Sequence, residues 1–157
     1  MSIDWQQGVI SRITSNIYLT DQYYDADFIR SLGIRRVLSI GGRREWPDDF
    51  AVMYAHLGDV STAPINRIFA SSFKWIDNGL KADESQKKIL IHCQAGISRS
   101  PTIVIAYLMW KLGMPYERAY AHVKRIRPFI NPNPGFSETL KKFDIFLQRN
   151  KMLKEKI

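Results

Sequence analysis

The stretch from Ile89 to Trp110 limits the fold of this chain more than any other, because it predicts a strand, a tight turn and a buried helix without a break. Residues 89–91 form a short apolar run, and residues 101–110 are almost wholly apolar and begin with Pro101, which suits the first turn of a helix. Along the rest of the chain, apolar runs of strand length alternate with segments whose apolar residues have helical spacing. The sequence therefore predicts an α/β fold, with a central, mostly parallel sheet flanked by helices and this turn at the carboxyl end of a strand.

The other elements are predicted from the spacing of apolar residues. A first short strand or hairpin is expected within residues 9–19, and further strands over 34–40 and 50–57. The expected helices, the first of them ended by Gly33, cover 25–32, 64–80, 116–127 and the last segment from Phe136. The length of 157 residues predicts a single domain, 1–157, with its core at about 10–147 and a basic C-terminal tail.

The turn over residues 94–99 predicts an anion site that needs no metal, because its backbone N–H groups and those of the following helix can point inward. It lies between Cys93, the only cysteine, and Arg99, whose planar guanidinium can hold two oxygens of a phosphoryl group. Gly96 allows the positive φ of a sharp turn. A cysteine in such surroundings is expected to be a thiolate at neutral pH. The alternative for Cys93 and Arg99 alone is an inert core cysteine and a chance spacing.

The full string, His92-Cys93-Gln-Ala-Gly-Ile-Ser-Arg99-Ser100, resembles the H-C-x-x-G-x-x-R-[ST] signature of the cysteine-based protein tyrosine phosphatases. The Ala-Tyr-Leu-Met segment at 106–109 is similar to the dual-specificity branch of that family. The resemblance covers about residues 10–147 and implies a protein tyrosine phosphatase-like single domain.

The resemblance also implies a role for each residue of the signature. Cys93 would be the nucleophile, and Ser100 would stabilise the departing thiolate. His92 would orient the loop and favour the thiolate, and Asn133, in a Pro-Asn-x-Gly-Phe turn, would brace the loop. The substrate phosphate would be held by six consecutive residues: Gln94, Ala95, Gly96, Ile97, Ser98 and Arg99.

The predicted chemistry also needs a proton donor for the leaving oxygen. The family resemblance places an aspartate on a loop after a strand, about thirty residues before the cysteine and just ahead of a helix, and Asp59 fits that place. The alternatives are Asp48 and Asp49, in the preceding turn, and Asp77, within the following helix. Asp59 is the predicted general acid, and the base in the second step.

The resemblance implies a dual-specificity protein phosphatase that acts on phosphotyrosine and phosphoserine or phosphothreonine through a phosphocysteine, with phosphorylated proteins as substrates. The alternatives are a phosphoinositide phosphatase, an RNA 5′-triphosphatase and a phosphate-binding pseudophosphatase. Lipid-directed relatives tend to carry lysines or arginines within this loop, so the resemblance, with neutral Gln94, Ala95, Ile97 and Ser98 here, implies protein over lipid substrates. The RNA-directed branch commonly has Asn-Arg-Thr where this chain has Ser-Arg-Ser, so the resemblance to that branch is weaker. The oligomeric state stays open.

Composition and charge limit the cellular location and the ligands expected for this chain. A single cysteine excludes an internal disulfide framework. The absence of a signal sequence, a lipidation motif or a membrane-spanning run predicts an intracellular protein, expected in the cytoplasm with the nucleus as an alternative. The net charge of +8 is interpreted as a solvated basic face, because no interleaved basic and aromatic residues predict nucleic-acid binding. His56, His92 and His122 lack metal-ligand spacing, so no metal and no cofactor are expected.

Two further basic positions are given non-catalytic interpretations. The Gly41-Gly-Arg-Arg44 turn could be a second phosphate-contacting loop, but a basic surface turn is favoured. Arg127 could contact a second phosphate, but a solvated residue at the end of a helix is favoured.

Overall fold

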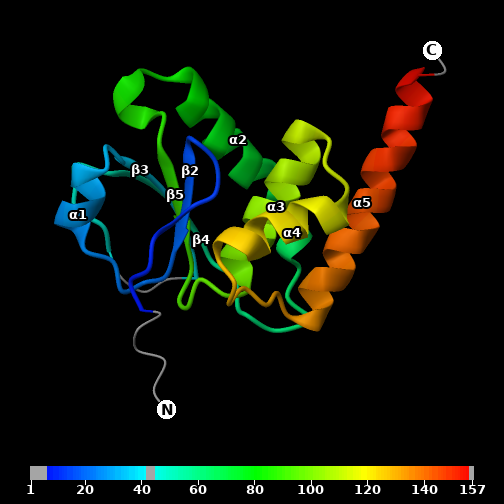
Figure 1. The fold of residues 1–157 in the computed structure, drawn as a ribbon, viewed down its shortest axis with the longest axis horizontal. Coiled ribbons are helices and arrows are strands. Elements are labelled where there is room, and N and C mark those ends of the chain that lie inside the picture. Colours follow the sequence, from blue (N-terminus) through cyan, green and yellow to red (C-terminus); the bar gives the residue numbers. More distant parts are fainter. Residues whose placement is uncertain (1–6, 42–44, 156–157) are drawn as a thin grey trace.

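A five-stranded sheet in the order β1-β2-β5-β3-β4 forms the centre of the fold (Figure 1). The computed structural model describes residues 7–41 and 45–155. β1 pairs antiparallel with β2, and all other neighbours are parallel, as the sequence predicted. The strands are β1 Ser11–Arg12, β2 Ile17–Thr20, β3 Arg36–Ile40, β4 Ala51–Ala55 and β5 Ile89–His92.

Helices cover both faces of this sheet, unequally. The α-helices are α1 Ala26–Ser31, α2 Phe69–Lys81, α3 Arg99–Leu112, α4 Tyr116–Ile126 and α5 Pro134–Glu155. Short 3₁₀ turns, η2 Ile65–Ile68 and η3 Glu84–Gln86, precede and follow α2. The helix expected over 64–80 therefore begins with a 3₁₀ turn. No helix among residues 7–41 and 45–155 is long and apolar enough to cross a membrane.

The alternation of side chains along the strands divides the core in two. Ile89 and Ile91 belong to the large cluster, which also contains the buried residues of α2, α3, α4 and α5. Leu90 points the other way, into a smaller cluster with Tyr24 and Trp46 beside α1. The central strand is thus buried on both faces, as its apolar sequence requires.

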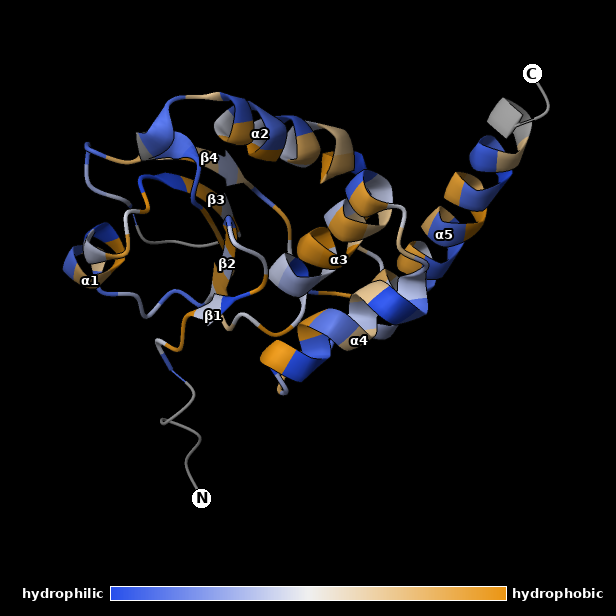
Figure 2. Cartoon of the chain, turned by 45° about the horizontal axis from the view of Figure 1, so that its top comes forward, coloured by the Kyte–Doolittle hydropathy of each residue, from blue (hydrophilic) through white to orange (hydrophobic). Residues whose placement is uncertain are grey.

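Helix α3 is the buried centre of the helical layer. Its residues from Arg99 to Met109 are all buried, and Figure 2 shows it as largely apolar. Helix α5 alternates polar and apolar residues in the same view, packs on the domain through its first turns and extends away from it toward the C-terminus (Figure 1). The strand-turn-helix stretch that the sequence singled out is therefore the central unit of the domain.

Candidate active site

The loop between β5 and α3 lies at the carboxyl edge of the sheet. β5 is hydrogen-bonded in parallel to both β2 and β3, so the loops that follow these strands meet at the same edge. The backbone of Gln22, just after β2, donates to the carbonyl of Gln94 at 3.1 Å. The carbonyl of Leu57, just after β4, accepts from the Arg99 guanidinium at 2.8 Å. The loops after β2 and β4 thus both contact the segment 94–99.

The carbonyl groups of this loop are held from outside. Three of them accept hydrogen bonds, at 3.1, 2.9 and 2.7 Å: Gln94 from Gln22 N, Gly96 from Arg127 Nε and Ile97 from Asn131 N. In a trans peptide the C=O and the next N–H point in opposite directions, so these bonds turn the following N–H groups toward the inside of the loop. Within the described part of the chain, the N–H groups of residues 94–99 have no acceptor. The loop therefore presents a set of unpaired donors suited to an anion.

The start of α3 adds to this cradle. Ser98 precedes the helix and its side chain does not cap it, because its hydroxyl accepts a hydrogen bond from Asn133 N at 3.0 Å instead. The first N–H groups of α3 are therefore left for a ligand. Gly96 has a φ of 66°, as the sequence predicted, and a Cβ there would collide with the backbone of Thr20 and the side chain of Arg127.

The cysteine lies at the base of the cradle. Cys93 is 2% exposed, and its Sγ lies 3.1 Å from the hydroxyl of Ser100, which is fully buried in the first turn of α3. When the sulfur is a thiolate it can only accept, so the Ser100 hydroxyl becomes the donor. This is the contact that the resemblance implied for the two residues.

The Arg99 side chain is held with part of its hydrogen-bonding capacity unused. Its Nη1 donates to the Leu57 carbonyl, whereas its Nε is buried and has no partner among the residues that the structure describes. Gly41, at φ 65°, lies against this guanidinium, and a Cβ at that position would overlap Arg99 and the Leu57 carbonyl. Gly41 thus makes room for Arg99. The remaining residues of the turn suggested as a second phosphate loop, 42–44, lie outside the described residues.

His92 is fixed in one tautomer by Trp46. The indole Nε1 donates to His92 Nε2 at 3.1 Å, and His92 Nδ1 lies 3.2 Å from the carbonyl of Cys93. An indole N–H can only donate, so Nε2 must be unprotonated and Nδ1 must carry the hydrogen. His92 is fully buried, and burial lowers its pKa to about 4. The ring is neutral at pH 7, and it can favour a thiolate only by positioning the Cys93 backbone, not by a positive charge.

Asp59 lies on the loop between β4 and η2 and is connected to the phosphate loop through Asn133. The Asn133 amide donates to Asp59 Oδ1 at 2.9 Å, while the backbone N of Asn133 donates to Ser98 Oγ. Asn133 Oδ1 also accepts from Phe136 N at 2.9 Å, at the start of α5. The backbone of Asn133 thus contacts Ser98 of the loop, while its side chain holds the predicted acid.

The alternative carboxylates are engaged or placed elsewhere. Asp49 accepts two hydrogen bonds from Arg30 of α1, and these hold the pKa of Asp49 below its usual range. Asp77 accepts from the Tyr107 hydroxyl at 2.7 Å and pairs with Lys111. Asp48 is exposed in the turn before β4. Asp59 is the candidate that contacts a residue of the phosphate-loop network.

A family model described as "Dual specificity phosphatase, catalytic domain" matches residues 17–146. The chain belongs to this family. Dual specificity protein phosphatase 1B of Arabidopsis thaliana is 36% identical over 126 residues, which cover 79% of this chain and 74% of that protein. Human dual specificity protein phosphatase 4 is 34% identical over 144 residues, 88% of this chain but 35% of the relative, so the chain spans about a third of its length.

The fold agrees with that assignment. The crystal structure of DUSP15 superposes with a TM-score of 0.81 at 28% identity, covering 94% of this chain and 96% of that one. The predicted α/β class and the suspected dual-specificity family are therefore confirmed.

Arg127 corrects one expectation for this phosphatase domain. It is fully buried, not solvated, and its Nη1 donates to the Val9 carbonyl at 2.7 Å and to Ser11 Oγ at 3.1 Å. The physical reason is that α4 ends at Ile126, and the non-helical backbone of Arg127 (φ −126°, ψ 83°) directs the side chain beneath the Gly96 carbonyl. Burial lowers the Arg127 pKa to about 10, which leaves it cationic at pH 7.

Three supporting groups of the phosphatase site were missed by sequence reasoning: Arg127, Trp46 and the Leu57 carbonyl. Arg127 belongs to a basic segment that is typical of a surface, and Trp46 lies next to a turn signal. No local pattern marks a backbone carbonyl as a ligand of Arg99. Within the described residues, no group of three or more His, Cys, Asp or Glu is placed to hold a metal ion.

Proposed function

We propose that this chain is a dual-specificity protein phosphatase that hydrolyses phosphotyrosine and phosphoserine or phosphothreonine on proteins through a phosphocysteine. The observation that carries the proposal is the 3.1 Å contact of Cys93 Sγ with Ser100 Oγ, inside a loop whose N–H groups find no acceptor among residues 7–41 and 45–155. The names of the relatives support it. The neutral residues of the loop, Gln94, Ala95, Ile97 and Ser98, favour protein over phosphoinositide substrates.

In the first step, the loop N–H groups and the Arg99 guanidinium bind the phosphoryl oxygens and stabilise the charge of the transition state. The Cys93 thiolate attacks phosphorus, the S–P bond forms and the bond to the leaving oxygen breaks. Asp59 gives its proton to that oxygen. A phenolate or alkoxide would otherwise leave, so the acid matters most for serine and threonine esters.

In the second step, the Asp59 carboxylate takes a proton from water, and the water oxygen attacks the phosphocysteine. The S–P bond breaks and inorganic phosphate leaves. The Ser100 hydroxyl donates to the sulfur as it regains its negative charge. A thiolate nucleophile works only while reduced, so we also propose a reducing intracellular compartment, with the cytoplasm as the expected location.

The test is phosphate release from three substrates in parallel: a doubly phosphorylated Thr/Tyr peptide, a phosphoinositide and triphosphate-ended RNA. We expect the peptide to be preferred and Cys93→Ser to be inactive. We expect Asp59→Ala to lose about 100-fold or more of its rate, most on phosphothreonine. A trapped ³²P-labelled protein that is absent from Cys93→Ser would establish the phosphocysteine.

Other outcomes would overturn the proposal. Preference for the lipid or the RNA would assign one of those substrate classes instead. No turnover of any substrate, with retained affinity for a phosphopeptide, would indicate a pseudophosphatase.

A further inference from the structure

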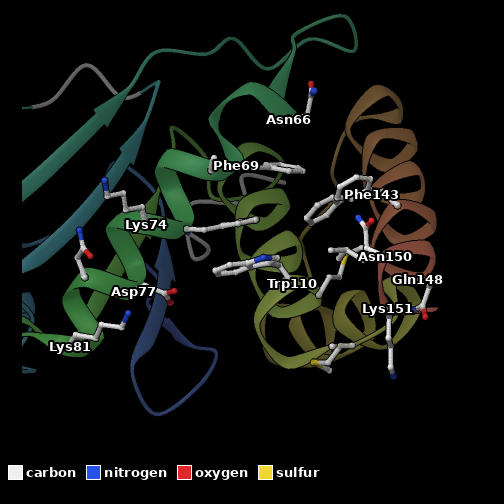
Figure 3. Close-up of a pocket in the computed structure, with 18 residues that line it drawn as sticks. Asn66, Phe69, Lys74, Asp77, Lys81, Trp110, Phe143, Gln148, Asn150 and Lys151 are labelled. Atoms are coloured by element: carbon white, nitrogen blue, oxygen red, sulfur yellow. The ribbon is translucent and has the colours of Figure 1, made fainter. Parts of the chain in front are cut away.

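An aromatic groove lies between α2 and α5, with α3 as its floor (Figure 3). Its volume is about 1100 Å³. Five rings from the three helices form a continuous series, here called the aromatic ladder, with neighbouring centroids 5.1, 5.6, 5.1 and 6.3 Å apart: Trp110, Phe73, Phe69, Phe143 and Phe146. None of these residues contributes to the phosphate loop.

The ladder is buried in the middle and exposed at both ends. Phe69 and Phe73 are 6% and 5% exposed, whereas Trp110 is 42% and Phe146 58% exposed. Large aromatic residues at the surface of a concave site are typical of binding anchors. The middle of the ladder is buried in the domain, whereas its two ends are open to contact with another molecule.

The margins of the groove are basic. The lining includes Lys74 and Lys81 of α2 on one side and Lys151 of α5 on the other, and Figure 3 shows the three on these two helices. These three lysines form no ion pair with any residue that the structure describes. The single carboxylate of the lining, Asp77, is already neutralised by Lys111 at 3.2 Å. The charge that faces an occupant is therefore positive.

We propose that this groove is a docking site for an acidic amphipathic helix of a partner protein. Apolar side chains at every third or fourth position of such a helix would pack against Trp110 and Phe146, and glutamates or aspartates beside them would pair with the lysines. The wall formed by α2, 13 residues long, spans about 20 Å, which matches about four turns of a bound helix.

Charge and shape argue against two other occupants. A second copy of this chain carries a net charge of +8 and would bring a second basic α5 against the first. A membrane binds protruding apolar faces, whereas Phe69 and Phe73 lie at the bottom of a concavity.

The test selects helical peptides that bind the full chain, from a displayed library of random sequences about 16 residues long. Two groove variants serve for counter-selection: Phe146→Ala, and Lys74→Glu combined with Lys81→Glu. All three side chains lie on exposed residues, so the fold is kept. Two matched controls change exposed residues outside the groove, Phe28→Ala on α1 and Arg118→Glu on α4.

We expect enriched peptides to be acidic, with apolar residues at spacings of three and four. Their affinity, measured by titration of tryptophan fluorescence, should fall about tenfold in each groove variant and stay unchanged in the controls. The effect of the lysine changes should shrink in high salt, because screening weakens exposed charge pairs. The Cys93→Ser protein should bind equally well, so the result is independent of the proposed catalysis.

Three results would overturn the proposal. The first is a failure to enrich any peptide that distinguishes wild type from the groove variants, or enrichment of basic peptides. The second is a dimer in sedimentation equilibrium that Phe146→Ala dissociates, which would make a second copy the occupant. The third is binding to vesicles with anionic headgroups that depends on Phe146, in the absence of peptide binding.

Discussion

Acidification should destabilise the folded chain through His92. The ring is fully buried between Trp46 and the Cys93 carbonyl, and burial lowers its pKa from 6.5 to about 4. Between these values the unfolded chain binds a proton that the folded chain does not, so the free energy of unfolding falls as the pH falls from 6.5 toward 4. At 1.36 kcal/mol per pKa unit, the loss approaches about 3 kcal/mol.

The assay is urea unfolding at a series of pH values between 7 and about 4, for wild type and His92→Gln. Glutamine offers an acceptor oxygen to Trp46 but takes up no proton in this range. Subtracting the pH dependence of the His92→Gln unfolding free energy from that of wild type therefore removes the contribution of the carboxylates. His56→Gln, at an exposed position, is the matched control and should follow wild type.

The wild-type curve should fall more steeply than the His92→Gln curve between pH 6.5 and 4. If the two curves run parallel, the buried neutral histidine does not exist as described, and the tautomer argument based on Trp46 fails with it.

Three further substitutions test other contacts. Arg99→Lys keeps the charge but loses the planar fork and the bond to Leu57, so kcat/KM for a phosphopeptide should fall about 10²- to 10³-fold with the fold intact by circular dichroism. Gly96→Ala places a Cβ against Thr20 at positive φ and should lower the free energy of unfolding by at least about 1 kcal/mol in urea; an unchanged midpoint would contradict the close approach. Arg127→Met leaves the buried Gly96 carbonyl unpaired, whereas the Val9 carbonyl keeps its bond from Thr20 Oγ1, so the free energy of unfolding should fall by about 2 kcal/mol in the same assay, and a neutral result would refute the structural role of Arg127.

The central unit of the fold could be predicted because its information is local. From Ile89 to Leu112 the apolar run, the turn and the apolar helix follow one another in the chain, and each is specified by its own residues. The same locality made the predictions for Cys93, Arg99 and Ser100 specific, since all three belong to one loop and the helix turn after it. The α/β class follows from the alternation of such units.

The support of the loop could not be predicted, because its partners come from distant segments. Gln22, Arg127 and Asn131 each hold a loop carbonyl, yet they lie between 31 and 72 positions away from their partners. Arg127 shows the difficulty most clearly: charge and a basic neighbourhood favour solvent, and only the backbone turn after α4 directs it inward. Three hydrogen bonds then offset part of the desolvation that such burial requires.

The loop between β4 and η2, which carries Asp59, contacts the start of α5, and this contact connects Asp59 with the phosphate loop at residues 94–99. Gly135 approaches Ser61 so closely that a Cβ would overlap the Ser61 backbone, and two residues earlier Asn133 binds both Asp59 and Ser98. The position of Asp59 is therefore set relative to the phosphate loop by a third segment, not by the loop itself. The Asn-Pro-Gly turn thus fixes the separation of Asp59 from Ser98, which the chain between residues 59 and 93 leaves open.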